Sequence, residues 1–430
     1  MLSTETNMKS ELGKIIKFYR AKYKIKQEVL CKGICTSSYL SRIENSKLIA
    51  DDEIYHLLFE KLNINFRSLL NNNFITNEKL ENIYMGLLNK NGDLKNMKDF
   101  FEDTEKSLLS DDLSIKYQLV YSKYLLLRKQ FNEADSIIKS IEKIKNNLSQ
   151  RNYFLFISIS IYKSLMTNNL KEGLELIADL DYEYISLNYR NNLEKGVFYY
   201  NIALCYCKNK VYYKCIQFCK TALKIFSDIY LPNFELNCHI LLGIAYNNIT
   251  FYNQSIHHYE ISENIINSSI INNKSYYLNM IFANTGYNYE SQGEFELAEK
   301  YYLQAIEISS DSDFQSMINL VRLYYIKNIP NRLSEYLHKL DNVSEQSPRF
   351  NYQIQIFTLL MSSNNVPIET IHKLQKESIQ YFKTNDLYNL AIFYNELFAR
   401  IYKERNLYKI AYELLEDSLY LSKKLMLGGE

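Results

Sequence analysis

The segment Tyr200–Ala222, YNIALCYCKNKVYYKCIQFCKTA, carries three small residues at a spacing that decides how the chain folds. Ala203 is followed twelve positions later by Cys215 and seven positions after that by Ala222. Two helices can cross at a short distance only where their side chains are small, so this spacing predicts a close crossing of a helix pair. We expect Tyr206, three residues after Ala203, to fill the space beside that crossing.

The same spacing recurs along the chain and is that of the tetratricopeptide repeat. It is seen in Gly286/Ala298/Ala305, in Ala399/Ala411/Ser418 and, with polar residues, in Gly243/Ser255/Ser262, while Ala134 and Gly173 are single anchors. Successive anchors of the second helix lie 39 to 43 residues apart, which exceeds the ~34 residues of a standard repeat and indicates longer helices or connections. We therefore expect a right-handed tetratricopeptide-like α-solenoid of about nine helix pairs over residues 76–430, with less regular pairs at 74–109, 313–341 and 349–383.

The composition favours an all-α protein. The 430 residues include 11 Gly and 4 Pro, against roughly 30 and 20 at average usage, so tight turns and phosphate-binding loops are scarce. The start of the chain shows no secretory signal, and no apolar run approaches the ~18 residues that a membrane span needs. Seven cysteines in such a chain are expected to be reduced thiols, which predicts a cytoplasmic protein without membrane contact.

Residues 1–70 form a separate, basic segment. Residues 1–50 hold ten basic and four acidic residues, whereas the remainder is mildly acidic, which suggests a polyanionic partner at one end only. The apolar spacing predicts a first helix through residues 12–19, and further helices are expected at 27–32, 36–46, 51–62 and 66–70, with a turn at Gly33 and an N-cap at Thr36. Five short helices predict a helix-turn-helix domain over residues 1–70, joined through a linker at 71–75 to the repeats.

The motifs Gln27-Glu28-Val29-Leu30 and Ser41-Arg42-Ile43-Glu44-Asn45 resemble the phage-repressor-like (XRE) helix-turn-helix. The resemblance implies phosphate contacts by Gln27 and Ser41, base contacts by Ser37, Ser38 and Tyr39, either contact by Arg42, and a partly buried ion pair of Arg20 with Glu44. The candidate DNA-binding residues are Gln27, Thr36, Ser37, Ser38, Tyr39, Ser41 and Arg42. Two features depart from the family: Cys31 replaces the usual Ala, and the turn Gly33-Ile34-Cys35 is one residue short. The alternative is a small helical bundle that only packs on its neighbour.

The concave face of the repeat array is the second candidate site. Asparagine offers both a donor and an acceptor, which suits the backbone of an extended peptide. The candidate peptide-binding residues near the predicted crossings are Asn201, Leu204, Asn247, Asn248, Asn284, Tyr287 and Glu290. The alternative is that asparagine is simply abundant in this chain. Asn201 and Asn284 are the stronger candidates, because each lies two residues before the anchor of a well-formed repeat.

A repressor-type head on a long repeat array resembles the RRNPP family of peptide-responsive regulators, and the segment Tyr200–Tyr206 is similar to their peptide-binding repeats. The resemblance implies a cytoplasmic transcription factor that binds double-stranded DNA as a homo-oligomer, a dimer or a tetramer. A short secreted and re-imported signalling peptide would bind the groove and change the spacing of the heads. Two alternatives stay open: sequestration of a response-regulator protein by the array, and a repressor with a non-peptide ligand.

Other residues with potential chemistry have simpler explanations. Cys205, Cys207, Cys215 and Cys219 could converge as a thiolate metal site, but Cys215 and Cys219 fall on an inward stripe where cysteine packs as a small apolar residue. Cys31 and Cys35 could form a redox switch, although Cys35 takes a position that the family buries. His257 and His258 are interpreted as part of a solvated helix surface. Because the sequence shows no nucleotide-binding loop or nucleophile motif, we expect no enzyme, no metal site and no cofactor.

Overall fold

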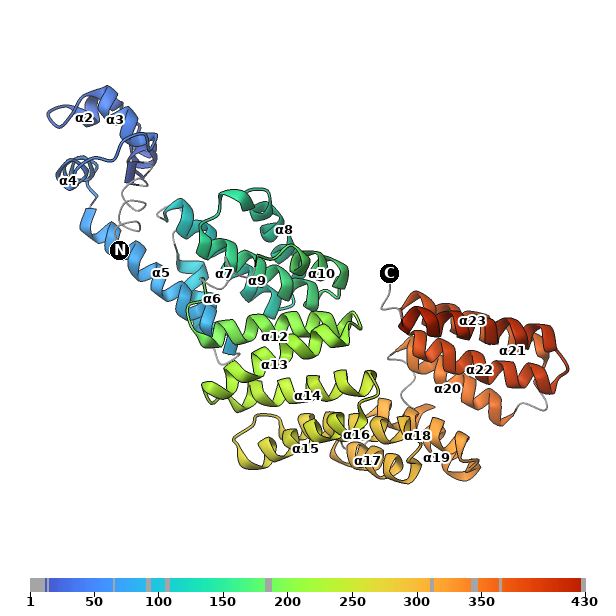
Figure 1. The fold of residues 1–430 in the computed structure, drawn as a ribbon. Coiled ribbons are helices and arrows are strands. Elements are labelled where there is room, and N and C mark those ends of the chain that lie inside the picture. Colours follow the sequence, from blue (N-terminus) through green and yellow to red (C-terminus); the bar gives the residue numbers. More distant parts are fainter. Residues whose placement is uncertain are drawn as a thin grey trace. The chain divides into compact units, whose positions relative to one another are not determined.

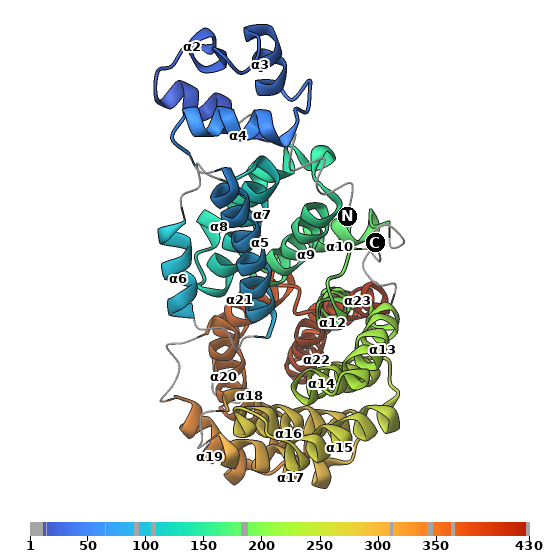
Figure 2. The same cartoon turned by 90° about the vertical axis from the view of Figure 1, so that its left-hand side faces the viewer.

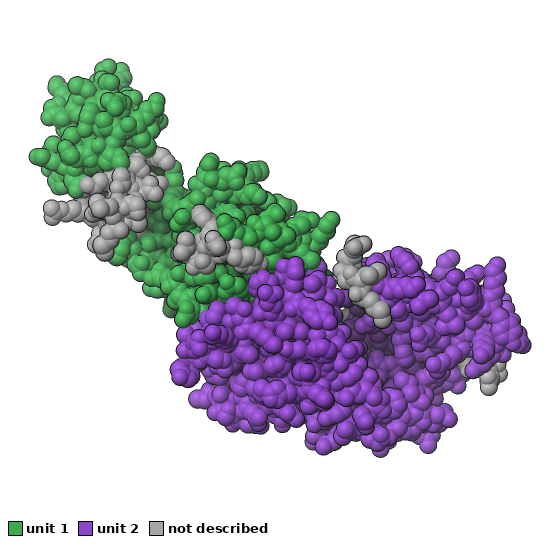
Figure 3. All heavy atoms as spheres, viewed as in Figure 1, with its two compact units in different colours: residues 1–205 green, residues 206–430 purple. Residues whose placement is uncertain are grey.

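The computed structural model describes residues 12–13, 15–64, 66–89, 94–104, 109–181, 188–309, 313–341, 347–362 and 366–426. Of residues 66–73 and 425–426 it describes the backbone alone. All regular structure in these ranges is helical, as the composition predicts (Figure 1). The chain divides into two compact units, residues 1–205 and residues 206–430 (Figure 3), and each unit is described by itself. None of the described helices is both long and apolar enough to span a bilayer.

Unit 1 begins with the predicted short helices. Residues 12–13 and 15–22 are helical, and α2 (Gln27–Cys31), α3 (Ser37–Glu44) and α4 (Asp52–Lys61) follow. Gly33 has a φ of +81°, which L-residues rarely adopt, and this allows the sharp turn between α2 and α3. The Thr36 side chain accepts a hydrogen bond from the Tyr39 backbone N–H, so the expected N-cap is present. The third helix ends at Glu44 rather than near Ser46.

The next helix corrects the expected linker. Helix α5 runs from Phe66–Asn89 without interruption, so the backbone is helical at residues 71–75. The short helix expected at 66–70 is the beginning of α5. Three successive asparagines favour turns when read in isolation, but they do not end a helix that packs further along. The division of the chain into domains at residue 70 stays a prediction.

The remaining helices follow α5 as successive pairs, nine in all among the described helices, which is the number expected from the repeat spacing. In unit 1, α5 is followed by α6 (Leu94–Asp103), then come α7 (Asp111–Leu127) with α8 (Phe131–Glu142) and α9 (Gln150–Met166) with α10 (Leu170–Ala178). Helix α12 (Asn192–Lys208) crosses the unit boundary, and unit 2 continues with α13 (Tyr212–Asp228), α14 (Pro232–Asn248), α15 (Tyr252–Ser268), α16 (Lys274–Ser291), α17 (Phe295–Ile308), α18 (Phe314–Ile326), α19 (Pro330–Asp341), α20 (Pro348–Met361), α21 (Ile368–Thr384), α22 (Tyr388–Glu404) and α23 (Tyr408–Met426). Within unit 2, α14 to α17 pack on their neighbours in sequence (Figure 2).

The predicted close crossings are present. A Cβ atom on Gly243 would lie 2.3 Å from the Tyr259 ring, and one on Gly286 would lie 2.7 Å from the Tyr302 ring, so α14 and α16 approach their partner helices more closely than any larger residue allows. The Ser255 hydroxyl donates a hydrogen bond of 2.8 Å to the carbonyl oxygen of Gly243, which explains a polar residue at that anchor.

The turns within the pairs are made largely without glycine. At these turns Asn168, Asn328 and Asn406 have positive φ angles of 54° to 62°. Asn and Asp tolerate this left-handed conformation because their short polar side chains form local hydrogen bonds. The low glycine content is therefore compatible with many helix ends.

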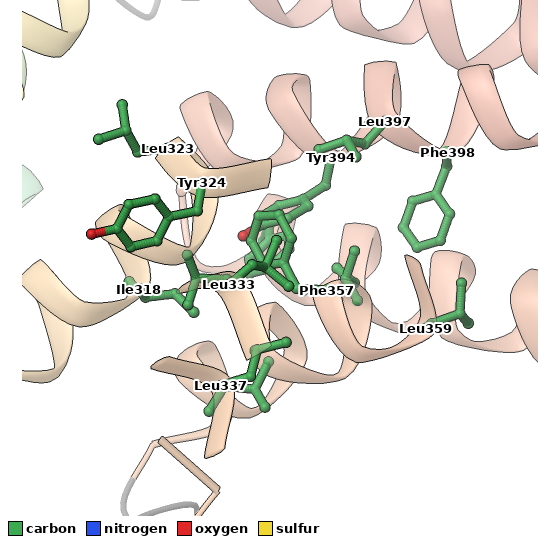
Figure 4. Packing of buried hydrophobic residues seen from close by; sticks show 14 of the residues in the cluster. Ile318, Leu323, Tyr324, Leu333, Leu337, Phe357, Leu359, Tyr394, Leu397 and Phe398 are labelled. Atoms are coloured by element: carbon green, nitrogen blue, oxygen red, sulfur yellow. The ribbon is translucent and has the colours of Figure 1, made fainter. Parts of the chain in front are cut away.

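Aromatic rings take the volume that tryptophan would otherwise fill. In unit 2, Tyr394 of α22 lies against Phe357 of α20 with ring centroids 5.9 Å apart, and against Phe382 of α21 at 5.4 Å (Figure 4). All three rings are almost completely buried. They belong to one apolar cluster that joins α17 to α23.

Candidate functional site

Helix α3 presents a polar, exposed face. Ser37, Ser38 and Arg42 are exposed, whereas Leu40 and Ile43 are buried in the apolar core of the first four helices. Tyr39 is half-buried and packs against the same core, so its ring is only partly available on the exposed face. The face offers hydroxyl donors and one guanidinium, groups that bind phosphate and base edges.

A buried ion pair fixes this helix to the first one. The Arg20 Nε lies 2.6 Å from Oε1 of Glu44, and its Nη2 lies 2.9 Å from Oε2, so the expected pair is present in bidentate form. The hydrogen bond to Glu44 raises the pKa of Arg20. The Gln27 amide donates to the same carboxylate at 2.6 Å, so one of its two N–H groups serves this network. The phosphate contacts of Gln27 and Ser41 stay predictions.

The candidate groove residues of unit 1 lie on α12. Asn201 is buried, with 7% of its surface exposed, and Leu204 is half-buried. Both precede Cys205, whose sulfur would lie 2.7 Å from a Cβ on Gly173. The small anchor at Gly173 therefore packs on the same helix that carries Asn201.

Unit 2 brings two groove asparagines together. The amide of Asn288 on α16 donates to Oδ1 of Asn247 on α14 at 2.8 Å, and Gln292 donates to Oδ1 of Asn288 at 2.7 Å. The sequence analysis named Asn247 but missed Asn288, which is completely buried. The separation of 41 residues equals one repeat and is the signal that could have paired them.

The other candidates of unit 2 differ in how free their polar groups are. Asn248 and Asn284 each donate to the carbonyl oxygen four residues earlier, at 2.9 and 2.8 Å, and Tyr287 is exposed. Glu290 is internally engaged: Arg322 of α18 donates two hydrogen bonds of 2.7 Å to its carboxylate, and the Tyr302 hydroxyl donates a third of 2.6 Å. The structure thus gives Glu290 an ion-pair contact rather than an open position in the groove.

One of the two histidines differs from the expectation: His257 is exposed, but His258 is not. His258 is half-buried, not on a solvated surface, and its Nδ1 lies 2.9 Å from Nδ1 of His239. Burial, together with the charge of the neighbouring His257, lowers the pKa of both imidazoles to about 4; His239 and Lys220 also contribute to the lowering at His258. Two neutral rings can share a hydrogen bond in which one nitrogen donates and the other accepts.

The cysteines are free thiols. The Cys219 thiol donates to the carbonyl oxygen of Cys238 at 3.4 Å, as a buried weak donor does. In the part of the chain that the structure describes, no three potential ligands converge in a metal-binding arrangement.

Unit 1 contains a buried charge cluster that the sequence analysis did not anticipate. Arg151 of α9 donates to Glu81 of α5 at 2.6 and 3.1 Å and to Glu194 of α12 at 2.9 Å, and Lys116 of α7 lies 2.8 Å from Glu81. Burial alone would raise the pKa of Glu81, but the hydrogen bonds and charge of Arg151, with the charge of Lys116, lower it to about 2. These ion pairs join α5, α7, α9 and α12.

The chain is similar to known proteins in sequence and in fold. No protein-family model matches the chain. The chain is similar to the transcriptional activator NprA of Geobacillus stearothermophilus, with 24% identity over 416 residues, which are 92% of this chain and 100% of that protein. It is also similar to the solved apo form of the quorum sensor NprR from B. thuringiensis, with 17% identity, a TM-score of 0.66 and coverage of 80% of this chain and 98% of that one. A structure of NprR in complex with its cognate peptide NprX has 18% identity, a TM-score of 0.57 and coverage of 81% and 96%. The two structures establish the helical-repeat solenoid fold.

Proposed function

We propose that this chain, a member of the RRNPP family of peptide-responsive regulators, is a cytoplasmic transcription factor that binds double-stranded DNA through residues 1–70 and is switched by a short signalling peptide. The observation that carries the proposal is the exposed polar face of α3, held on the first helix by the Arg20–Glu44 pair. Its position before a repeat array supports a regulator in which one part reads DNA and the other binds a ligand.

The DNA contacts would come mainly from the backbone of the duplex. Ser37 and Ser38 can each make single hydrogen bonds to base edges, while Arg42 alone on this face can make a bidentate contact to guanine or to a phosphate. Lys17, Lys47 and other exposed basic residues of the head add sequence-independent attraction. We therefore expect strong salt dependence and modest sequence preference.

The peptide would lie along the first helices of the repeats. Of the candidate residues there, Asn248 and Tyr287 are exposed, Leu204 and Asn284 are half-buried, and Asn201 and Asn247 are buried and would need to become accessible. NprR, a structural neighbour, has been solved with its cognate peptide, which supports this assignment. A peptide changes an equilibrium only if it binds two arrangements of the protein with unequal affinity. In a twofold homodimer the two copies of α3 must be about 34 Å apart, or a multiple of that, to enter successive major grooves.

The DNA proposal is tested with Arg42→Ala. Duplexes enriched by the wild-type protein from a randomised pool serve as the probe in a fluorescence-anisotropy titration. We expect affinity to fall by about 1–3 kcal/mol, roughly 5- to 150-fold. Arg128→Ala, which removes an exposed arginine outside the head, should bind like the wild type. Equal binding by Arg42→Ala and the wild type would refute this docking of α3.

The peptide proposal is tested with Asn201→Ala and Asn284→Ala. Thermal-shift screening of the wild type against short synthetic peptides should find ligands, since a ligand at 100 times its dissociation constant adds about 2.7 kcal/mol to stability. Both variants should bind such a peptide more weakly and still bind DNA without it. If both bind the peptide unchanged, the site lies elsewhere. Capture of a response-regulator protein that peptides release would favour the sequestration alternative.

A further inference from the structure

Two arginines on successive first helices of unit 2, Arg322 and Arg349, differ in their partners. Arg322 of α18 has a bidentate counter-ion, because its Nε and Nη2 each lie 2.7 Å from an oxygen of Glu290 on α16. The side chains of this pair are 14% and 9% exposed. The charge of Glu290 is thus used by Arg322 and by the Tyr302 hydroxyl.

Arg349, one repeat further on in α20, has no such partner. Its Nε is buried and donates no hydrogen bond. Its electrostatic neighbours among the described residues are Tyr394, Tyr381 and Arg322, and none of them is a carboxylate. The guanidinium carbon lies 5.5 Å from the centre of the Phe350 ring. Burial lowers the pKa of Arg349, and the positive charge of Arg322 lowers it further.

An arginine in this setting carries its charge at a cost. The guanidinium stays protonated in proteins, so it cannot escape burial by losing its proton. Arg349 is half-buried, and its buried Nε–H has lost its hydrogen bond to water without gaining an acceptor, which is unfavourable. Such departures from good packing are expected where a protein binds something.

The surroundings fit an acidic group better than a neutral one. The planar fork of arginine matches the two oxygens of a carboxylate. The Tyr394 hydroxyl donates to Oε1 of Gln353 at 3.0 Å, and its oxygen accepts no hydrogen bond from Nε of Arg349. Glu290, Arg322, Arg349 and Tyr394 come from α16, α18, α20 and α22, the first helices of four successive repeats, and first helices line the concave face of such arrays.

We propose that Arg349 is the binding site for a carboxylate of the peptide ligand. The inference rests on the proposed peptide-binding function and adds to it the charge of the ligand and the repeat that recognises it. The carboxylate has two sources, an acidic side chain or the carboxyl terminus of the peptide. Arg322 would then contribute long-range attraction while keeping its bond to Glu290.

The site itself is tested without a peptide. In ¹⁵N-labelled protein the Nε–Hε resonance of Arg349 is assigned by its absence from Arg349→Gln. Titration with sodium acetate should shift this resonance, while sodium chloride at equal ionic strength should not. No shift with acetate, or a shift with inorganic phosphate alone, would overturn the carboxylate site. The urea midpoint of Arg349→Gln should equal or exceed that of the wild type, because the substitution removes a buried N–H group that has no acceptor; a clearly lower midpoint would indicate a structural role.

The ligand is tested by affinity selection from a soluble library of randomised heptapeptides, read by mass spectrometry. One library has free carboxyl termini and the other is amidated. The wild type should retain acidic peptides from the amidated library if a side chain binds, and only free-acid peptides if the terminus binds. Arg349→Gln should retain them at least tenfold less, and Arg332→Gln, an exposed arginine on the outer helix α19, should behave as the wild type.

The outcomes separate the two proposals. Retention of amidated peptides without acidic residues, or equal retention by Arg349→Gln, would overturn the carboxylate assignment and leave peptide binding in place. Retention of no peptide by the wild type would overturn the proposed function and the assignment to a peptide, while the acetate-dependent shift would still support a carboxylate site at Arg349.

Discussion

Replacing Glu81 by glutamine tests the charge cluster that holds α5 against the repeats of unit 1. The side chain of Glu81 is 5% exposed and contacts Arg151 of α9 and Lys116 of α7. Glutamine keeps the shape and one acceptor but removes the negative charge. Arg151 retains Glu194 as a partner, whereas Lys116 retains the Asn77 side chain, which is uncharged.

The magnitude follows from the pKa of Glu81, which is lowered from 4.5 to about 2. A shift of one unit corresponds to 1.36 kcal/mol, so the charged form contributes about 3 kcal/mol to the stability of the folded state. The folded pKa lies below the unfolded one. This contribution is therefore complete above about pH 4.5 and is lost as the pH falls toward 2. The figure agrees with the roughly 3–5 kcal/mol observed when one partner of a buried pair is removed.

Urea denaturation of the wild type, Glu81→Gln and Glu194→Gln at pH 7 and at decreasing pH measures this contribution. We expect Glu81→Gln to lose about 3 kcal/mol at pH 7 and the difference from the wild type to shrink below pH 4.5. Burial raises the pKa of Glu194, so its charge is not favoured by folding and its glutamine variant should lose much less. Equal losses in the two variants, or no loss in Glu81→Gln, would refute the reasoning.

Three further substitutions are expected to report on packing, pH dependence and the head. In Gly243→Ala the new Cβ meets the Tyr259 ring at 2.3 Å; overpacking of roughly 1–3 kcal/mol should exceed the ~1 kcal/mol gained in helix propensity and lower Tm, and a higher Tm would contradict the close crossing. Burial lowers the pKa of His239 and His258 from 6.5 to about 4, so the unfolded chain binds protons at a higher pH than the folded one. The free energy of unfolding should therefore fall as the pH is lowered from 6.5 to 4. In urea titrations His239→Gln should show a smaller fall, and an unchanged fall would exclude the pair as its cause. Glu44→Gln leaves Arg20 without its counter-ion and should speed hydrogen exchange in α3 and weaken DNA binding, with unaltered exchange in α3 as the contrary result.

The repeat anchors were predictable because their cause is local and steric. Ala203, Cys215, Ala298 and Ala305 are completely buried, and Gly243 faces the Tyr259 ring. Residues that must be small to let two helices approach recur at a regular spacing in the sequence. This spacing can still be recognised where a serine replaces the alanine. Position and residue size are enough to place these crossings without knowledge of any distant partner.

The continuation of α5 through residues 71–75 could not be predicted from local propensity. Asparagine is a weak helix former, so Asn71-Asn72-Asn73 predicted a break. The structure continues α5 to Asn89, and its later part is fixed by Glu81 and by the buried Tyr84, whose hydroxyl lies 3.2 Å from that of Ser158. Local propensity differs by well under 1 kcal/mol per residue among most residues, whereas tertiary contacts decide where a helix ends.

The contacts at the candidate sites also differ in whether a sequence pattern could predict them. The pair of Arg20 with Glu44 could be placed because a family pattern covers both residues, which lie 24 positions apart. The contact between Glu81 and Arg151 spans 70 positions with no pattern that links them. Glu290 looked like a groove residue from its helix position, and only the position of Arg322 in the next repeat shows where its charge is used.

The continuity of α5 bears on how a ligand could act in the proposed regulator. A hinge at residues 71–75 would let the head move independently, so a change among the repeats would not reach it. An uninterrupted helix from Phe66–Asn89 instead carries Glu81 in the same rigid element as the residues that follow the head. Lys116 of α7 and Arg151 of α9 meet at that carboxylate, and Arg151 also contacts Glu194 of α12. Any rearrangement of these three helices must therefore either move α5 or separate buried charges. Moving a helix as a unit is cheaper than leaving several kcal/mol of buried charge uncompensated. The cluster therefore favours transmission of a change along α5 over its absorption within the repeats.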